Sequence, residues 1–217
     1  ISPDFLKFCD YSNSPCGSPF AATSIAFSHD LEGIVVGSED GIVRIFHHRD
    51  LRILSSFIPQ SRGSSISCVA FTGSSAQVIT GTGSAIGIWD VRTSSSSFSI
   101  VCSSEIASCD ADGFVVCSGR NDGIVDIWDL RFPKQQLFAN RVHSEIVWDV
   151  RFHRPSCHSL VSCSEDGSVM LWDFGGSKQT LETIEMFSFG ANSVDIEQTR
   201  GLVASVSDSF HLSIRDT

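Results

Sequence analysis

The stretch from His143 to Asp173, HSEIVWDVRFHRPSCHSLVSCSEDGSVMLWD, contains short runs with the composition and spacing of β-strands. Apolar and polar residues alternate from Ile146 to Phe152 and again from Ser168 to Trp172, and a small, apolar run from Ser159 to Ser164 lies between them. Glu165-Asp166-Gly167 separates the last two runs. Asp-Gly between two such runs predicts a tight hairpin, because a type I′ turn needs positive φ at both central residues.

Four further copies of this pattern, some of them weaker, can be aligned with the first. The aromatic or apolar residues that close the third strand are separated by 39 to 44 residues: Phe46, Trp89, Trp128, Trp172 and Ile214, the last standing in place of tryptophan. A leading His, an Asp-Gly turn and a closing Trp-Asp at a period of ~40–45 residues are typical of WD repeats. Helical repeats would show apolar stripes of period 3.6, which are missing. The sequence therefore predicts an all-β WD-repeat β-propeller with five visible blades.

The predicted organisation is a single propeller preceded by a short irregular segment. Residues 1–21 form the irregular segment and residues 22–217 the propeller, with blades at about 22–57, 65–102, 105–139, 143–187 and 192–217. Because the sequence starts with Ile1 and not with methionine, we expect a piece, or the ordered part, of a longer protein.

Composition restricts the class of function. Hydrophobic residues make up 41% and charged residues 18% of the chain, which indicates a folded core. The net charge of −10 argues against direct binding of nucleic acid or of anionic lipid, since both require an excess of Lys and Arg. No apolar run approaches the ~18 residues of a membrane span, so membrane insertion is not expected. None of the eight cysteines forms a CxxC pair, and we interpret them as buried thiols in a reducing compartment.

A buried polar set is predicted in the fourth repeat, where His143, Ser164, Asp166 and Trp172 occupy the positions of a hydrogen-bonded WD tetrad. Such a set is stable when every member is paired. The same residue types could form a catalytic triad, but no nucleophile elbow or Gly-rich cradle surrounds them. Paired carboxylates, metal-spaced ligands and a phosphate loop are also missing. We therefore expect no enzyme activity, no catalytic residues, no metal, no cofactor and no small-molecule substrate.

One candidate binding residue is Trp148. It follows the first apolar position of an inner strand, a position that tends to face a partner, and the matching residues of the other repeats are the smaller Thr23, Ser67 and Ala107. A large aromatic residue at a surface position is a candidate anchor for a partner. The alternative, left open by the sequence, is that it packs on a neighbouring loop.

Arg92 and Arg131 are the other candidate partner-binding residues. They end two consecutive WDxR motifs, Trp89-Asp90-Val91-Arg92 and Trp128-Asp129-Leu130-Arg131. The motif resembles the one by which some WD proteins dock on the damaged-DNA-binding adaptor of cullin-RING ubiquitin ligases. The simpler interpretation is that each arginine forms a salt bridge at the edge of its own blade.

The order of the imperfect repeats resembles one family. The segments SEDGIVRIF, VITGTGSAIGIWDVR, GRNDGIVDIWDLR and VHSEIVWDVRFHRPSCHSLVSCSEDGSVMLWDF, together with the loop from Ser14 to Pro19, are similar in order to the blades of the forty-three-kilodalton WD-repeat nucleoporins of the Y-shaped outer-ring subcomplex of the nuclear pore. The resemblance covers roughly residues 14–217, and Trp148 is its least generic match. The stretch after Asp173 is shorter than the family pattern.

The resemblance implies a seven-bladed ring, with two blades before Ile1, and a structural role at the nuclear envelope. It implies other nucleoporins as partners, support of pore assembly, mRNA export and protein import, and kinetochore localisation in some lineages. Two alternatives stay open from the residues: a substrate receptor of a cullin-RING ligase, through Arg92 and Arg131, or a propeller that reads peptides or histones, through Trp148.

Overall fold

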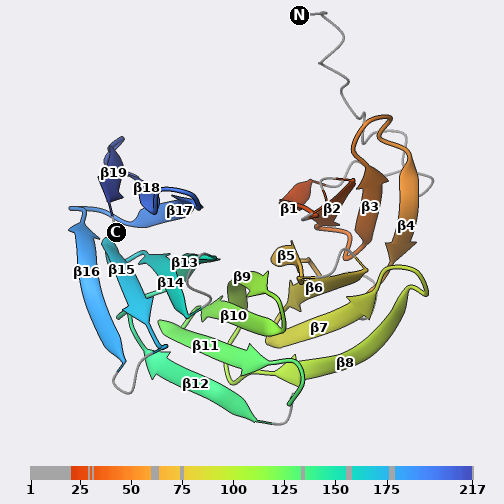
Figure 1. Ribbon diagram of the computed structural model, residues 1–217, viewed down its shortest axis with the longest axis horizontal. Helices are drawn as coiled ribbons and strands as arrows, with labels where there is room; N and C mark the ends of the chain where they lie inside the picture. The colour runs from red at the N-terminus through yellow and green to blue at the C-terminus, as the bar shows by residue number, and fades with distance from the viewer. Residues whose placement is uncertain are drawn as a thin grey trace, which may run out of the picture.

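The protein folds into five antiparallel sheets arranged around a common centre, as the computed structural model shows (Figure 1). The structure describes residues 21–216 except 29, 31, 60–63, 74–75, 133–134, 155–157 and 176–178. Within these ranges every regular element is a strand. The irregular segment predicted for residues 1–21 lies, apart from Ala21, outside the described residues.

Each sheet is formed by strands that follow one another in the chain. Blade 1 contains β1 (Ala22–Phe27), β2 (Gly33–Ser38), β3 (Val43–His47) and β4 (Ile53–Phe57). Blade 2 contains β5 (Cys68–Phe71), β6 (Gln77–Thr82), β7 (Ala85–Asp90) and β8 (Ser95–Val101). Blade 3 contains β9 (Ile106–Asp112), β10 (Val115–Arg120), β11 (Ile124–Asp129) and β12 (Gln136–Arg141). Blade 4 contains β13 (Val147–Phe152), β14 (Ser159–Ser164), β15 (Ser168–Asp173) and β16 (Thr180–Met186). Blade 5 contains β17 (Ala191–Glu197), β18 (Leu202–Ser207) and β19 (Leu212–Asp216).

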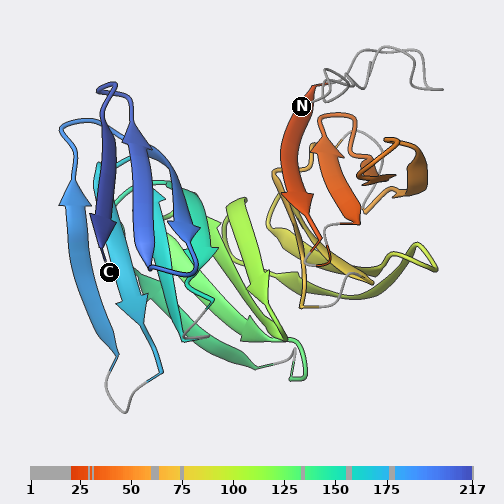
Figure 2. The same ribbon diagram turned by 45° about the horizontal axis from the view of Figure 1, so that its top comes forward.

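The blades have two ends, which we name by their sequence signatures. The DG face carries the turns between second and third strands and the connections from one blade to the next. The WD face carries the turns between first and second strands and those between third and fourth strands. The innermost strands β1, β5, β9, β13 and β17 line the centre, and the five blades form an open arc in which blades 1 and 5 flank the mouth (Figures 1 and 2).

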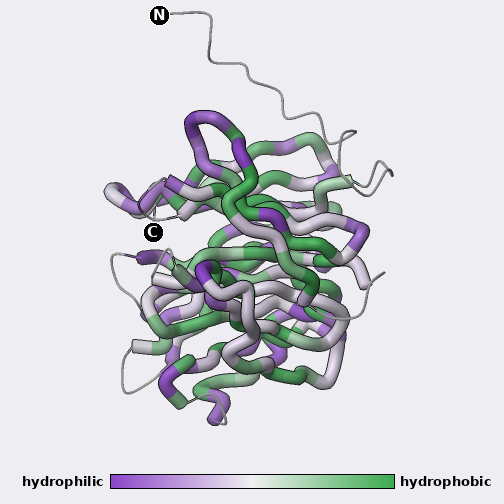
Figure 3. Tube along the Cα trace, turned by 90° about the vertical axis from the view of Figure 1, so that its right-hand side faces the viewer, coloured by the Kyte–Doolittle hydropathy of each residue, from purple (hydrophilic) through white to green (hydrophobic). Residues whose placement is uncertain are grey.

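The core lies between blades, because neighbouring sheets pack face to face and blades 2, 3 and 4 each have a neighbour on both sides. Each of the four apolar clusters combines residues of two neighbouring blades, as where Ile45 and Phe57 of blade 1 meet Val78 and Trp89 of blade 2. The rings of Phe57 and Trp89 stack at 4.9 Å between centroids. Apolar positions therefore run along the strands and polar ones gather in the connections (Figure 3).

Register in blade 5 differs from the sequence interpretation. In blade 4 Trp172 lies opposite Leu160, and the corresponding partner in blade 5, Val203, lies opposite Arg215. Arg215, and not Ile214, therefore occupies the position of the closing tryptophan. Its guanidinium pairs with Glu185 of β16 at 2.7 Å, so an ion pair replaces the aromatic contact to the preceding blade. The sequence assignment was one residue off because the blade 5 turn lacks its Asp-Gly landmark.

The two ends of the arc expose apolar faces. Ile25 and Phe27 of β1 are exposed, whereas Val150 and Phe152, which occupy the same positions in blade 4, are buried. On blade 5, Val206 and Leu212 are exposed where Cys163 and Val169 of blade 4 are buried. These end faces have the composition of surfaces that the other blades bury against a neighbour.

Candidate protein-binding surfaces

His143 is the centre of a buried hydrogen-bonded set in blade 4. Its Nε2 lies 2.7 Å from the Ser162 hydroxyl and its Nδ1 lies 2.8 Å from the Ser168 hydroxyl. The Ser168 hydroxyl donates to the Asp166 carboxylate at 2.5 Å, so the Ser168 oxygen accepts a hydrogen bond from the Nδ1–H of His143. The Nε2 of His143 is then unprotonated and accepts a hydrogen bond from the Ser162 hydroxyl. Asp166 also accepts the Ser144 amide.

The structure corrects one member of the predicted tetrad. Ser162 contacts His143, while the Ser164 hydroxyl accepts the amide of Asp166 and so caps the turn. Both serines point to the same face of β14, and the sequence alone did not distinguish them. Trp172 is buried and packs edge-to-face against Phe174. Both ring nitrogens of His143 and the hydroxyls of Ser162 and Ser168 take part in hydrogen bonds within the set.

His143 is expected to make folding sensitive to pH. Burial lowers the pKa of His143 below its ordinary value of 6.5, although Asp166 opposes this shift. The unfolded chain therefore takes up a proton before the folded protein does, so stability is fully present above about pH 6.5 and is lost as the pH falls through the folded pKa. Denaturant unfolding at pH 7.5 and pH 5.5 should show a larger loss for the wild type than for a His143→Gln variant. Equal losses would mean that His143 does not couple folding to pH.

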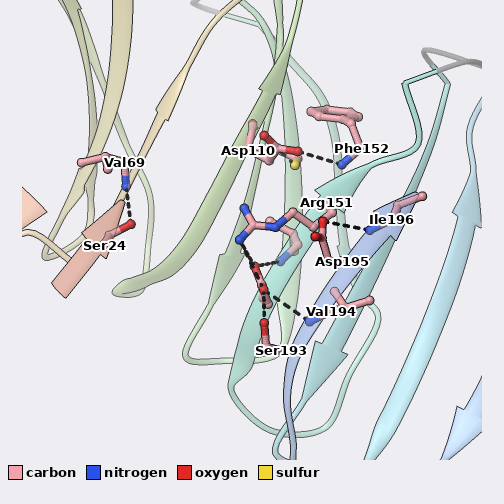
Figure 4. A network of polar contacts seen from close by, with 12 residues as sticks. Ser24, Val69, Asp110, Arg151, Phe152, Ser193, Val194, Asp195 and Ile196 are labelled. Carbon is pink, nitrogen blue, oxygen red and sulfur yellow. Dashed lines mark hydrogen bonds and ion pairs between the residues drawn. The ribbon is translucent and has the colours of Figure 1, made fainter. Parts of the chain in front are cut away.

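Carboxylates on the inner strands join neighbouring blades (Figure 4). Asp110 of β9 accepts the amide of Phe152 in β13, and Asp149 of β13 accepts the hydroxyl of Ser193 and the amide of Val194 in β17. Ser24 of β1 accepts the amide of Val69 in β5 in the same manner. The inner strand of each blade is an edge strand, so some of its backbone amides have no strand partner. These side chains accept hydrogen bonds from such amides.

Arginines neutralise part of this central charge. Arg154 pairs with Asp110 at 3.1 Å and Arg151 pairs with Asp149 at 3.3 Å. Burial raises the pKa of Asp149, and Arg151 acts against that rise. The pair of Arg154 and Asp110 thus links blades 3 and 4, whereas Arg151 and Asp149 pair within β13.

Among the described residues, no group of three or more His, Cys, Asp or Glu side chains could hold a metal ion. In the same part of the chain, no helix is long and apolar enough to cross a membrane. Cys68, Cys102, Cys109, Cys117 and Cys163 are free and buried, as the sequence interpretation expected of its cysteines.

Trp148 is 42% exposed and lies on the DG face. A register shift in β13 between Val147 and Asp149 makes Trp148 the extra residue of a β-bulge, which turns its side chain out of the ladder. Its Nε1 donates to the carboxylate of Glu165 at 2.6 Å. The ring is thus held by a neighbouring turn and still presents a face to solvent, and its role as an anchor for a partner stays a prediction.

Arg92 and Arg131 lie on the WD face of adjacent blades. Arg92 pairs with Asp90 at 3.0 Å and Arg131 pairs with Asp129 at 2.6 Å, and both side chains are mostly exposed. The hydrogen bond from Arg131 holds the pKa of Asp129 below its ordinary value. Each arginine therefore forms the blade-edge salt bridge and leaves its outer surface open to solvent.

Two aromatic residues that the sequence interpretation missed accompany Arg131. Phe114 and Phe132 are 58% and 64% exposed, and the Arg131 guanidinium lies 5.5 Å from the centroid of the Phe114 ring. Phe114 follows Gly113 in a turn, and Phe132 follows the WDxR motif directly. A large apolar residue directly after a glycine, and another directly after a WDxR motif, were the signals that could have identified them.

Comparison with known proteins supports the WD assignment. The family model described as "WD domain, G-beta repeat" matches residues 14–47 and 134–173. The mouse protein "Nucleoporin Nup43" is 28% identical over 199 residues, which cover 84% of this chain and 47% of that protein. The Dictyostelium discoideum "Nuclear pore complex protein nup43" is 25% identical over 88% of this chain and 48% of that protein.

A different relative covers nearly the whole chain. The "Target of rapamycin complex 1 subunit mip1" of Schizosaccharomyces pombe is 22% identical over 99% of this chain but over only 18% of that protein. The chain spans about half the length of the nucleoporins it matches. With its five sheets and matched repeats, this chain is a WD-repeat β-propeller that resembles Nup43.

Proposed function

We propose that this chain is part of a non-catalytic scaffold nucleoporin of the outer-ring Y complex of the nuclear pore. The observation that carries the proposal is the similarity to Nup43 proteins of mouse and Dictyostelium over more than four fifths of the chain. Partners would be other Y-complex nucleoporins at the nuclear envelope, and pore assembly, mRNA export and protein import would depend on this attachment.

The geometry of the blades agrees with such a role. His143 and Asp166, which resemble members of a catalytic triad, are hydrogen-bonded to Ser168 within the structural set of blade 4. The exposed apolar end faces, with Ile25 and Phe27 on blade 1 and Leu212 on blade 5, support a ring with further blades, which we place at seven in total. The DG face and the WD face would then remain as the surfaces that bind partners.

Affinity purification of the full-length tagged protein from a nuclear extract, followed by mass spectrometry, tests the proposal. We expect Y-complex nucleoporins in stoichiometric amounts. Recovery of a cullin with its adaptor, or of target-of-rapamycin complex subunits, in the absence of nucleoporins would contradict it.

The exposed arginine pair supports the second candidate function, a substrate receptor of a cullin-RING ligase. Under our proposal, the double substitution Arg92→Ala and Arg131→Ala should leave the recovery of nucleoporins unchanged, because both arginines bond within their own blade edge. A ligase receptor should instead lose its adaptor in a pulldown. We expect an unchanged Tm for the double variant, since exposed ion pairs contribute little to stability.

A further inference from the structure

The bulge contact of Trp148 belongs to a repeated arrangement with one unusual member. In blade 5 the corresponding bulge residue, Asn192, donates to Asp208, which occupies the turn position of Glu165. Trp148 makes the same contact with Glu165 but adds a large exposed ring. Asn192 shows that a small side chain is enough to connect the bulge to the turn. The large exposed indole of Trp148 is therefore not required for this contact.

The carboxylate of Glu165 contacts one exposed aromatic residue and lies beside the connection that carries a second. On one side it holds Trp148, and on the other it lies against the backbone of Gly190, where any Cβ would come within 2.7 Å of Oε2. Phe189 precedes Gly190 and is 64% exposed. The carbonyl of Phe189 packs on the turn glycine Gly167, which ties this connection to the Glu165 turn.

Charge is distributed unevenly between the two faces of the propeller. Exposed carboxylates occupy the connections and turns of the DG face: Glu39, Glu105, Glu145, Glu165 and Asp208. In the described part of that face, Arg141 is the one exposed arginine. The WD face also has exposed carboxylates, but there they are accompanied by exposed arginines: Arg49, Arg52, Arg92, Arg131 and Arg200. The aromatic residues at Glu165 therefore lie in a field that attracts positive charge.

We propose that Trp148, Glu165 and Phe189 form a binding surface for an extended, basic segment of a partner protein. An arginine or lysine side chain of that segment stacks on the indole face and pairs with the Glu165 carboxylate, which the Trp148 N–H already orients. Apolar residues beside it contact Phe189. This surface does not depend on the nuclear-pore assignment, because its geometry lies within blade 4 and its connection to blade 5.

Selection of a random peptide-display library on the full-length protein tests the proposal. We expect enrichment of peptides with Lys or Arg next to apolar residues. Titration of a synthesised enriched peptide should then change the intrinsic fluorescence, because Trp148 is the most exposed tryptophan, whereas Trp89 and Trp172 are buried and Trp128 is half-buried.

Three variants locate the binding. Measured by isothermal titration calorimetry, which needs no tryptophan reporter, Trp148→Ala and Glu165→Gln should each weaken the affinity about tenfold or more. Glu165→Gln keeps an acceptor for the indole N–H and removes the negative charge. A loss of affinity in this variant would therefore show that the carboxylate pairs with a cationic side chain of the peptide. Phe132→Ala, which removes an equally exposed ring from the WD face, should leave the affinity unchanged.

Several results would overturn the proposal: enrichment of acidic peptides, no enriched peptide, or an affinity that neither Trp148→Ala nor Glu165→Gln reduces. The assay uses purified protein and does not involve the pore. Failure here would leave co-purification with nucleoporins unaffected, and failure of that co-purification would leave the peptide result intact.

Discussion

Replacing Gly123 by alanine should destabilise the protein by about 3 kcal/mol, because strain and overlap add at this position. Gly123 follows Asp122 in the turn between β10 and β11 and has a φ of +80°, which L side chains rarely adopt. A Cβ there would lie 2.2 Å from the carbonyl oxygen of His143. That atom belongs to the backbone that connects blades 3 and 4, so it has little freedom to move.

Gly113→Ala is the matched control. Gly113 also has positive φ, +57°, but no atom lies within 4 Å of its added Cβ. The control retains the cost of the left-handed conformation, about 1 kcal/mol, without the overlap. Denaturant unfolding of both full-length variants should therefore differ by about 2 kcal/mol. Equal losses of unfolding free energy in the two variants would show that the backbone between blades 3 and 4 moves away from the added Cβ. The cost would then come from the left-handed backbone conformation alone.

Replacing Arg120 by alanine should cost about 3–5 kcal/mol, since it leaves a buried carboxylate without its partner. Arg120 stands at the end of β10, where Ser164 stands in blade 4, and pairs with the fully buried Asp126 at 3.1 Å and with Asp122 at 3.0 Å. Asp126 also accepts a hydrogen bond from Gln136. This ion-paired set replaces the histidine set in blade 3.

The pH dependence of the Arg120→Ala variant identifies the cause. Burial raises the pKa of Asp126, and Arg120 is the main opposing influence. Without the arginine, the folded pKa lies still higher above the unfolded one, so ionisation of Asp126 costs stability as the pH rises through the folded pKa. The variant should regain stability on acidification relative to the wild type.

A double variant, Arg120→Leu with Asp126→Leu, supplies the control for the loss of packing. Replacing both charges by apolar side chains removes the unpaired carboxylate, and we expect a much smaller loss than in Arg120→Ala. A double variant as unstable as the single one would indicate that the ion pair itself, and not an unpaired charge, determines stability here.

Much of the fold could be predicted because its signals are local. Alternation along each strand and the Asp-Gly turns depend on residues adjacent in the chain, and the observed strands follow them closely in blades 1, 3 and 4. The prediction was wrong in blade 5, where the turn between the second and third strands has no Asp-Gly pair. Phe210 occupies the left-handed turn position that Gly41, Gly123 and Gly167 fill elsewhere, and without a glycine there the register of β19 was assigned one residue off.

The candidate surfaces were predicted only in outline. Trp148, Arg92 and Arg131 were singled out by motif and position, and the structure places all three at the surface. Glu165, Phe189 and Phe114 were missed, since their importance comes from neighbours that are distant in sequence. The choice of Ser162 over Ser164 likewise depends on where the connection from blade 3 delivers His143.

The sequence by itself determined the all-β class, the repeat period and the positions of the turns, because backbone geometry at a turn or along a strand responds to the residues that form it. The predicted type I′ turn at Glu165-Asp166-Gly167 was wrong, since only Gly167 of these three residues has a positive φ. Only the tertiary structure decided which side chains meet: the contact between Trp148 and Glu165, the ion pairs of Arg120, and the carboxylates that join inner strands. These contacts depend on how one sheet is packed and rotated against the next, and that arrangement is set by burial across blades rather than by any local pattern.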